Sequence, residues 1–294
     1  MTNQRKLQGR KILVTGASQG LGLAVAERCL AEGADIAICA RSAAPLEAAA
    51  ATLRAKAAAG QRVWAGAADV SNPAAVDKLV ADATAALGGL DGLCNNAGVY
   101  GPKGNIEDVD WAEWAKAIEI NLMGTVLPCR AVLPGFRARG AGKIVNLSGG
   151  GATTPMPALS AYAASKAAVV RFTETLALEV AGTKIDVNAV APGALNTRML
   201  DEVLTAGPEK VGKAFYDRAL KQKAEGGTPL EKGAALCAFL LSAESDGVTG
   251  RLLSAVWDPW ADLPARREEL TKSDIYTLRR IVPKDRGQDW GEPK

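Results

Sequence analysis

The 294-residue chain contains no histidine, and this absence limits the chemistry available to it near neutral pH. Without an imidazole, Ser-His-Asp and Cys-His catalysis are excluded, as are most zinc sites and imidazole proton relays. Acid–base chemistry near pH 7 must therefore use tyrosine, lysine, cysteine or carboxylate side chains.

Cysteine and net charge are also low. The five cysteines are odd in number and scattered, mostly inside apolar segments, which suits reduced thiols in a cytoplasmic protein. The net charge of +3 is too small to indicate a nucleic-acid partner. No apolar run approaches transmembrane length and the N-terminus is polar, so we expect a soluble, untargeted protein with no membrane partner.

Short apolar segments alternate with longer helical ones along the chain. The expected strands cover residues 11–15, 35–40, 62–68, 90–95, 143–148, 185–190 and 251–257. The expected helices cover residues 20–32, 43–59, 73–87, 108–137, 161–181 and 231–242. This alternation predicts an α/β fold, a doubly wound parallel sheet of about seven strands with helices on both faces. Ligands then bind beyond the carboxyl ends of the strands.

A glycine-rich loop joins the first expected strand to the first expected helix. It contains Gly16, Ser18, Gly20, Leu21 and Gly22. Glycines let the backbone approach a pyrophosphate, and a helix N-terminus offers free N–H groups and a positive dipole end. The loop therefore predicts a dinucleotide-phosphate site.

Of the four tyrosines, only Tyr162 has a lysine four residues later, Lys166. On a helix this spacing places both side chains on one face. An ammonium beside a phenol favours the phenolate, so we expect Lys166 to lower the pKa of Tyr162 from its ordinary value of about 10. Such a phenol can protonate a carbonyl oxygen or accept a proton from an alcohol. The alternative is an amphipathic helix whose tyrosine packs and whose lysine is solvated.

Taken in order, the motifs of this chain resemble those of the short-chain dehydrogenase/reductase family in its compact single-domain form. The matching segments are Thr15–Gly22, Asp69-Val70, Asn95–Gly98, Asn121, Tyr162-x-x-x-Lys166 and Pro192-Gly193. They cover roughly residues 8–257. We expect residues 1–257 to form one catalytic domain and residues 258–294 to form a C-terminal extension. The resemblance implies a Rossmann fold and an oxidoreductase that interconverts a ketone or aldehyde and an alcohol. It also suggests a homodimer or homotetramer that acts on a small molecule.

The resemblance further implies a role for each matching residue. Tyr162 would exchange the proton, while Lys166 would hold the nicotinamide ribose and Asn121 would hold a water next to the lysine. For Asn121, the alternative is an amide whose hydrogen bonds are satisfied locally. The implied cofactor contacts, beyond the glycine loop, Tyr162 and Lys166, are Asp69, Val70, Asn96, Gly98, Pro192, Gly193, Leu195 and Thr197. For Asp69, which would bracket the adenine with Val70, the alternative is a helix N-cap.

The end of the second expected strand bears on the choice of cofactor. Ala40 stands where NAD-preferring relatives carry an aspartate, and Arg41 and Ser42 follow. An arginine here can hold a 2′-phosphate through charge-assisted hydrogen bonds, with Ser42 as a second donor. We therefore expect NADP(H), the alternative being a solvated arginine that opens a helix.

The serine that polarises the substrate carbonyl in this family is displaced in this chain. Its usual position, three residues after Asn146, is Gly149, and Ser148 stands one residue early. Side chains alternate faces along a strand, so this offset can point Ser148 away from Tyr162. A bulge in the glycine run that follows would instead turn Ser148 back toward Tyr162, so Ser148 stays a catalytic candidate. The alternatives are that Thr153 polarises the carbonyl or that Tyr162 does so alone.

Two further segments concern specificity. Residues 198–227 match the mobile lid of this family, and residues 258–294 are too rich in apolar and aromatic residues to be disordered. We expect this tail to dock, with a helix around 270–281, as a strap on its own subunit or as an arm on a neighbour. The rival functions are a cofactor-retaining epimerase or isomerase and a catalytically weak NADP-binding sensor or scaffold.

Overall fold

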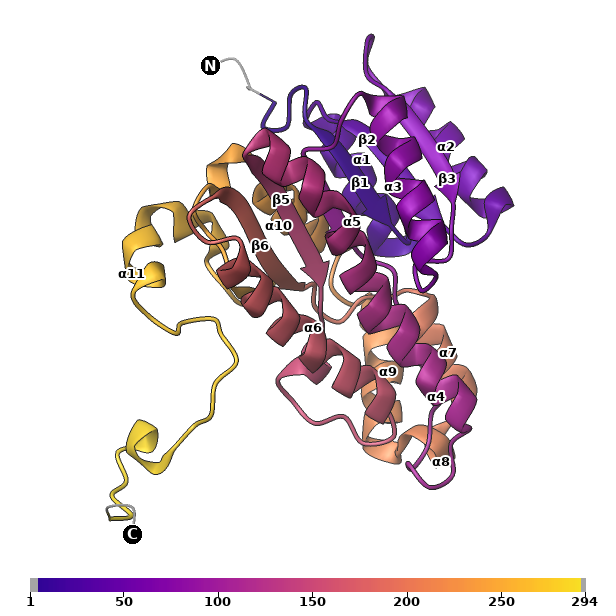
Figure 1. The fold of residues 1–294 in the computed structure, drawn as a ribbon. Helices are drawn as coiled ribbons and strands as arrows, with labels where there is room; N and C mark the ends of the chain where they lie inside the picture. Colours follow the sequence, from indigo (N-terminus) through magenta and orange to yellow (C-terminus); the bar gives the residue numbers. More distant parts are fainter. Residues whose placement is uncertain (1–4, 292–294) are drawn as a thin grey trace.

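Seven parallel strands form one sheet at the centre of the computed structural model, which describes residues 5–291 (Figure 1). They are β1 (Lys11–Thr15), β2 (Asp35–Ala40), β3 (Val63–Ala67), β4 (Gly92–Asn95), β5 (Ala141–Leu147), β6 (Lys184–Ala191) and β7 (Leu252–Ser254). The order β3-β2-β1-β4-β5-β6-β7 confirms the predicted doubly wound sheet. The chain changes direction across the sheet between β1 and β4, and ligands bind at such a switch point.

Helices cover both faces of the sheet. One face carries α1 (Gly20–Ala31), α2 (Ala43–Lys56) and α10 (Leu230–Leu241), and the other carries α3 (Pro73–Leu87), α5 (Gly124–Arg139) and α6 (Ser160–Glu179). The residues of β1 show why its sequence is continuously apolar. Ile12 and Val14 enter one core cluster and Leu13 enters the other, because side chains alternate faces along a strand.

The helix expected over residues 108–137 is divided in the structure. It consists of α4 (Trp111–Ile118), a π-helical turn (Glu119–Met123) and α5. Short π-helical turns within α-helices are frequent at functional sites. The turn contains Asn121, one of the predicted site residues.

The expected lid is a small helical subdomain rather than an irregular loop. Its helices are α7 (Arg198–Ala206), α8 (Pro208–Val211) and α9 (Lys213–Glu225). They share a core made by Leu200, Val203, Val211 and Ala219. This core is small and separate from the two clusters under the sheet, which fits a segment of lower local stability.

The first part of the tail packs on the body of the protein. It contains a 3₁₀ turn (Trp260–Arg266) and α11 (Arg267–Thr271). Leu263 and Leu270 are buried in the same core cluster as Ile12 and Val14 of β1, and the Trp260 ring lies 5.3 Å from that of Phe239. The expectation that the tail docks therefore holds for this part.

The expected helix around 270–281 is wrong, because α11 ends at Thr271 and the chain continues through turns and irregular structure. The guanidinium of Arg251 donates hydrogen bonds to the carbonyls of Ser273 (3.0 Å) and Ile275 (2.6 Å), so these carbonyls do not close helical turns. The amide of Leu252 in β7 donates to the carbonyl of Tyr276 (2.8 Å). The tail thus runs along the edge strand of the sheet.

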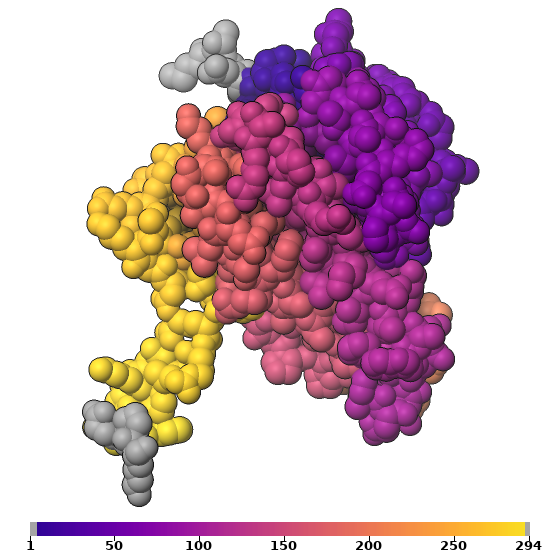
Figure 2. All heavy atoms as spheres, viewed as in Figure 1, coloured from indigo at the N-terminus to yellow at the C-terminus, as the bar shows by residue number. Residues whose placement is uncertain are grey.

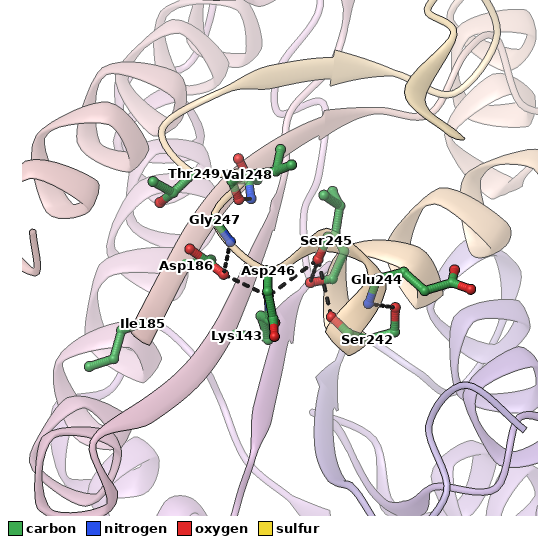
Figure 3. Close-up of polar contacts among 12 residues, drawn as sticks. Lys143, Ile185, Asp186, Ser242, Glu244, Ser245, Asp246, Gly247, Val248 and Thr249 are labelled. Atoms are coloured by element: carbon green, nitrogen blue, oxygen red, sulfur yellow. Dashed lines mark hydrogen bonds and ion pairs between the residues drawn. The ribbon is translucent and has the colours of Figure 1, made fainter. Parts of the chain in front are cut away.

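A buried ion pair ties together the amino ends of β5 and β6 (Figure 3). Nζ of Lys143 lies 2.6 Å from Oδ2 of Asp186 and 2.7 Å from Oδ1 of Asp246, which belongs to the segment between α10 and β7. Asp186 also accepts a hydrogen bond from the amide of Gly247 (3.2 Å). This cluster lies at the end of the sheet opposite the carboxyl ends of the strands, so it stabilises the fold rather than the site. Within residues 5–291, no helix has the length and apolar character needed to span a bilayer.

Candidate active site

The glycine loop after β1 packs directly on the end of β4. A Cβ at Gly16, where φ is +64°, would lie 2.7 Å from the Cα of Ala97, and a Cβ at Gly22 would overlap Nδ2 of Asn96. That Nδ2 donates hydrogen bonds to the carbonyls of Thr15 (3.1 Å) and Gly16 (3.0 Å). Asn96, predicted as a cofactor contact, therefore braces the loop through its side chain.

Thr15 is a site residue that the sequence did not single out for a role. Its Oγ1 accepts hydrogen bonds from the backbone amides of Asn96 (3.1 Å) and Ala97 (3.2 Å). The hydroxyl thereby fixes the last residue of β1 against the segment that follows β4. The sequence feature that could have indicated this role is a β-branched polar residue directly before the glycine loop.

The N-terminus of α1 fits an anionic pyrophosphate. Gln19, its N-cap residue, makes no side-chain cap hydrogen bond, and the first turn contains no acidic residue. The first-turn N–H groups therefore have no side-chain acceptor, and they carry the positive end of the helix dipole. A Cβ at Gly20, where φ is +59°, would lie 3.6 Å from the methyl group of Thr197. The segment after β6 thus closes over the loop, as the prediction for Thr197 requires.

Other predicted residues after β6 meet the same loop. A Cβ at Gly233 in α10 would lie 3.0 Å from Leu21 and 3.1 Å from Pro192. Gly193 has a φ of +96°, a conformation that favours glycine, and Leu195 packs against the core cluster that contains Ile12 and Val14. The structure therefore brings the two glycine-containing segments together at the carboxyl edge of the sheet.

Arg41 and Ser42 are exposed at the carboxyl end of β2. Arg41 forms no ion pair with any described residue, so its guanidinium is available to an anion. Ser42 is the N-cap residue of α2 but makes no side-chain cap hydrogen bond. Both side chains are therefore exposed and uncommitted among the described residues.

Asp69 lies at the end of β3, where its carboxylate is held by Ser71. Its Oδ1 accepts hydrogen bonds from the Ser71 hydroxyl (2.6 Å) and amide (2.9 Å). The hydroxyl hydrogen bond is the main reason that the pKa of Asp69 is lowered, and the charge of Arg41 contributes to the same shift. The N-cap of α3 is Asn72, so Asp69 does not cap that helix. Val70 is buried against Gly124 at the start of α5.

The helix α6 brings Tyr162 and Lys166 to the carboxyl end of β5. Both side chains are buried, and Nζ of Lys166 lies 5.8 Å from the Tyr162 ring centroid. Lys166 donates a hydrogen bond to the carbonyl of Leu147 (2.7 Å), the last residue of β5. Desolvation by burial lowers the pKa of Lys166 to about 8.

The pKa of Tyr162 moves in the direction opposite to our expectation. Burial raises it well above the ordinary value for a phenol, and Tyr100 contributes a smaller shift of the same sign. The reason is that desolvation penalises the phenolate, and Lys166, itself buried, does not offset this effect. Tyr162 is therefore protonated at neutral pH.

Asn121 is fully buried beside Lys166. Its Oδ1 accepts from the amide of Val99 (2.8 Å), and its Nδ2 donates to the carbonyl of Val99 (2.9 Å) and to the Ser165 hydroxyl (2.9 Å). A Cβ at Gly98 would lie 3.2 Å from Oδ1 of Asn121 and 3.5 Å from Nζ of Lys166. The amide is thus satisfied by two segments distant in sequence rather than locally, and it lies next to the lysine.

The backbone after β5 determines which of two positions, Ser148 or Gly149, faces Tyr162. The buried hydroxyl of Ser148 donates to the carbonyl of Lys166 (3.3 Å), and it forms no hydrogen bond with Tyr162 among the described residues. A Cβ at Gly149, in contrast, would overlap the hydroxyl oxygen of Tyr162 and lie 3.3 Å from its Cζ. Position 149 therefore faces Tyr162 and carries no side chain, whereas Ser148 is turned toward α6.

Tyr100 is a second residue that the sequence reasoning missed. Its ring packs edge-on against that of Tyr162, with centroids 4.8 Å apart and an interplanar angle of 71°. It also packs on the lid core. Lys103 lies 5.9 Å from the centroid of the Tyr100 ring and 3.5 Å from the carboxylate of Glu202 in α7. The sequence feature that could have indicated Tyr100 as a site residue is its position, two residues after the Asn95–Gly98 motif.

This geometry is typical of a class of protein, the dinucleotide-binding oxidoreductases, with a glycine loop at the switch point of the sheet and a tyrosine–lysine pair beside the end of β5. A sequence model of the short chain dehydrogenase family matches residues 10–206. The chain belongs to this family.

Named relatives support the assignment. The chain is 39% identical over 249 residues to 3beta-hydroxysteroid dehydrogenase 1 of Eggerthella lenta, an alignment that covers 84% of this chain and 92% of that protein. It is 35% identical over 248 residues to levodione reductase of Leifsonia aquatica, with coverages of 83% and 91%.

Two solved structures have the same fold. A levodione reductase crystal structure aligns with a TM-score of 0.77 at 33% identity, covering 88% of this chain and 98% of the other. The crystal structure of NAD⁺-bound xylitol dehydrogenase aligns with a TM-score of 0.76 at 29% identity, covering 85% and 98%. The protein is accordingly an oxidoreductase of the alcohol/ketone type that uses a nicotinamide cofactor.

Proposed function

We propose that this protein is an NADP(H)-dependent oxidoreductase that interconverts a small ketone or aldehyde and the corresponding alcohol, with Tyr162 as general acid and base. One observation carries the proposal. The Tyr162 hydroxyl lies against the carboxyl end of β5, at position 149, with Lys166 buried beside it. Two relatives, a hydroxysteroid dehydrogenase and a levodione reductase, support a carbonyl or alcohol substrate.

The cofactor would lie at the carboxyl edge of the sheet, between the residues that follow β1 and β3 and Lys166 of α6. The glycine loop and the N-terminus of α1 would hold the pyrophosphate, and Asp69 with Val70 would border the adenine. Lys166 would hold the nicotinamide ribose. When bound, the cofactor supplies or accepts the hydride.

The preference for NADP(H) rests on Arg41. Its guanidinium is exposed and free of ion pairs among the described residues, and the neighbouring Ser42 does not use its hydroxyl to cap α2. A relative of the same fold binds NAD⁺, so the fold alone does not select the cofactor. The charge at the end of β2 supports the phosphorylated form, because an arginine can neutralise the 2′-phosphate.

The proton is handled by Tyr162 and Lys166. The raised pKa of Tyr162 keeps the phenol protonated, which suits donation to a carbonyl oxygen during reduction. In the reverse direction the nearby ammonium of Lys166 favours the phenolate that accepts the proton of the alcohol. Because Ser148 is turned toward α6 and position 149 has no side chain, we assign polarisation of the substrate oxygen to Tyr162 without a serine.

The test is turnover of a carbonyl panel with NADPH by Tyr162→Phe, with Tyr276→Phe in the tail as the matched control. The Tyr162→Phe protein should bind NADPH normally but lose about a hundred-fold or more in turnover, the usual contribution of a positioned proton donor. Ser148→Ala should lose less than about tenfold. Retention of most activity by Tyr162→Phe would rule out the mechanism. Net consumption of NADPH separates a reductase from an epimerase, and binding without any turnover would indicate a sensor or scaffold.

A further inference from the structure

Residues 279–291 form an arm that leaves the body of the protein. Figures 1 and 2 show this yellow segment projecting away from the rest of the chain, with open space between them. Each hydrogen bond and ion pair found for these thirteen residues is made within residues 274–291. The arm thus makes no polar contact with the body among the described residues.

The arm nevertheless has a defined conformation. Asp285 accepts hydrogen bonds from the amide of Val282 (2.7 Å) and from Arg279 (2.8 Å), and these bonds close a 3₁₀ turn (Pro283–Arg286). Large apolar side chains flank this turn, since Ile281 is 58% exposed and Trp290 is 79% exposed. An ordered segment that shows apolar side chains to solvent is typical of an interaction surface.

A second exposed apolar surface lies at the start of α4, and we call it the α4 surface (residues 105–114). Ile106 is 57% exposed, and Trp111, 69% exposed, stacks on Trp114 with centroids 5.1 Å apart. Its charged residues before Trp114 are all acidic, and none of them forms an ion pair with a described residue: Glu107, Asp108, Asp110 and Glu113. The arm has the opposite balance, with four basic residues against two acidic ones: Arg279, Arg280, Lys284 and Arg286 against Asp285 and Asp289.

We propose that the arm of one copy of this chain docks on the α4 surface of a second copy. Each surface carries exposed apolar side chains, and the α4 surface is acidic whereas the arm is mainly basic. Docking would therefore bury apolar side chains and bring charges of opposite sign together. Within one chain, α4 and the arm lie on opposite sides of the molecule, so the arm meets this surface only on another copy (Figure 1). Two chains related by a twofold axis would exchange two such contacts.

The α4 surface is connected to the candidate active site. Nε1 of Trp114 donates a hydrogen bond to the hydroxyl of Ser160 (3.0 Å), the first residue of the helix that carries Tyr162. The amide of Gly104, just before this surface, donates to the carbonyl of Ala158 (3.1 Å). An arm docked there would therefore border the active site of its partner, which makes each site dependent on two chains.

Disulfide trapping tests the contact directly. The five native cysteines are buried, so Ile106→Cys with Ile281→Cys adds two accessible thiols. Mild oxidation at micromolar protein should give a covalent dimer on a non-reducing gel, whereas Ala48→Cys with Ile281→Cys, a pair that places one thiol on α2, should stay monomeric. An intrachain bond in the Ile106/Ile281 variant, or no bond at all, would overturn the proposal. Native circular dichroism and NADPH binding of both variants confirm that they are folded.

Charge reversal tests the role of the electrostatic contact. Arg280→Glu with Arg286→Glu should abolish trapping in the Ile106/Ile281 cysteine background, and Glu107→Lys with Asp108→Lys in the same chain should restore it. Lys184→Glu, a reversal at the exposed start of β6, should leave the yield of trapped dimer unchanged. Raising the salt to about 1 M, where the Debye length is roughly 3 Å, should lower the initial trapping rate. Failure of the reciprocal reversal to restore trapping would refute the pairing of these two surfaces.

Discussion

Gly149 tests how the site works, because replacing it with serine, the residue usual at this position in the family, should lower the rate of turnover. A Cβ at this position would overlap the Tyr162 hydroxyl oxygen, which therefore has to move by about 1 Å to regain an ordinary van der Waals separation. Tyr162 is buried and packed against Tyr100, so it has little room to move aside. Misplacement of a reacting group by about 1 Å can cost on the order of a hundred-fold in rate.

We therefore expect Gly149→Ala and Gly149→Ser to lower turnover by about ten- to a hundred-fold with little effect on NADPH affinity. The matched control is Gly150→Ala, because a Cβ at Gly150 meets no heavy atom within 4 Å. The assay is initial-rate kinetics with NADPH and the best ketone from the carbonyl panel, with NADPH affinity measured separately by fluorescence. A Gly149→Ser protein that turned over faster than the unmodified one would refute the reasoning, since it would show that Tyr162 relaxes and that a serine was the missing part.

Arg41, Lys166 and Asp186 carry three further predictions, each based on a named contact. Arg41→Ala should weaken NADPH binding by roughly ten- to a hundred-fold and leave NADH binding unchanged; equal affinities for both cofactors in the unmodified protein would exclude the 2′-phosphate contact. Burial lowers the pKa of Lys166 to about 8 in the free protein, and an anionic cofactor beside it would raise that pKa again, so binding at about pH 9 should take up a proton. Titration calorimetry in buffers of different ionisation enthalpy would measure this uptake, which Lys166→Met should abolish. Asp186→Asn removes the closer of the two carboxylates that pair with the buried ammonium of Lys143 and leaves Asp246, so the free energy of unfolding should fall by about 1.5–3 kcal/mol in urea denaturation, with unchanged kinetic constants at 25 °C.

The sheet could be predicted closely from the sequence because its strands are apolar on both faces. The expected ranges 11–15 and 35–40 coincide with β1 and β2, and 73–87 coincides with α3. The π-helical turn around Asn121 was not predictable, because it depends on hydrogen bonds to Val99 and Ser165 from distant segments. The non-helical path after α11 likewise depends on one buried side chain, that of Arg251.

The site was predictable where residue type and chain position determine the outcome together. The glycine loop and the residues Tyr162 and Lys166 lie at the carboxyl edge as the strand–loop–helix pattern requires. The raised pKa of Tyr162 was not predictable, because burial is a property of the folded chain and Lys166 does not offset its effect. The orientation of Ser148 depended on the backbone at the end of β5, which continues to alternate and does not bulge back toward Tyr162. The role of Tyr100 was not predictable, because its contact with the lid joins segments about a hundred residues apart in sequence.

The packing of the tail has a consequence for how the chain reaches its native state during synthesis. Leu263 and Leu270 belong to the same core cluster as Ile12 and Val14, so residues made early and residues made late complete one core. Contacts of such long sequence separation form slowly, because a large loop must close before they add stability. A nascent chain that still lacks residues 260–270 exposes part of this cluster, and exposed apolar surface of this kind makes partly synthesised chains prone to aggregate. Chaperone dependence should therefore persist until translation is nearly finished, even though the Rossmann strands and the glycine loop are synthesised much earlier.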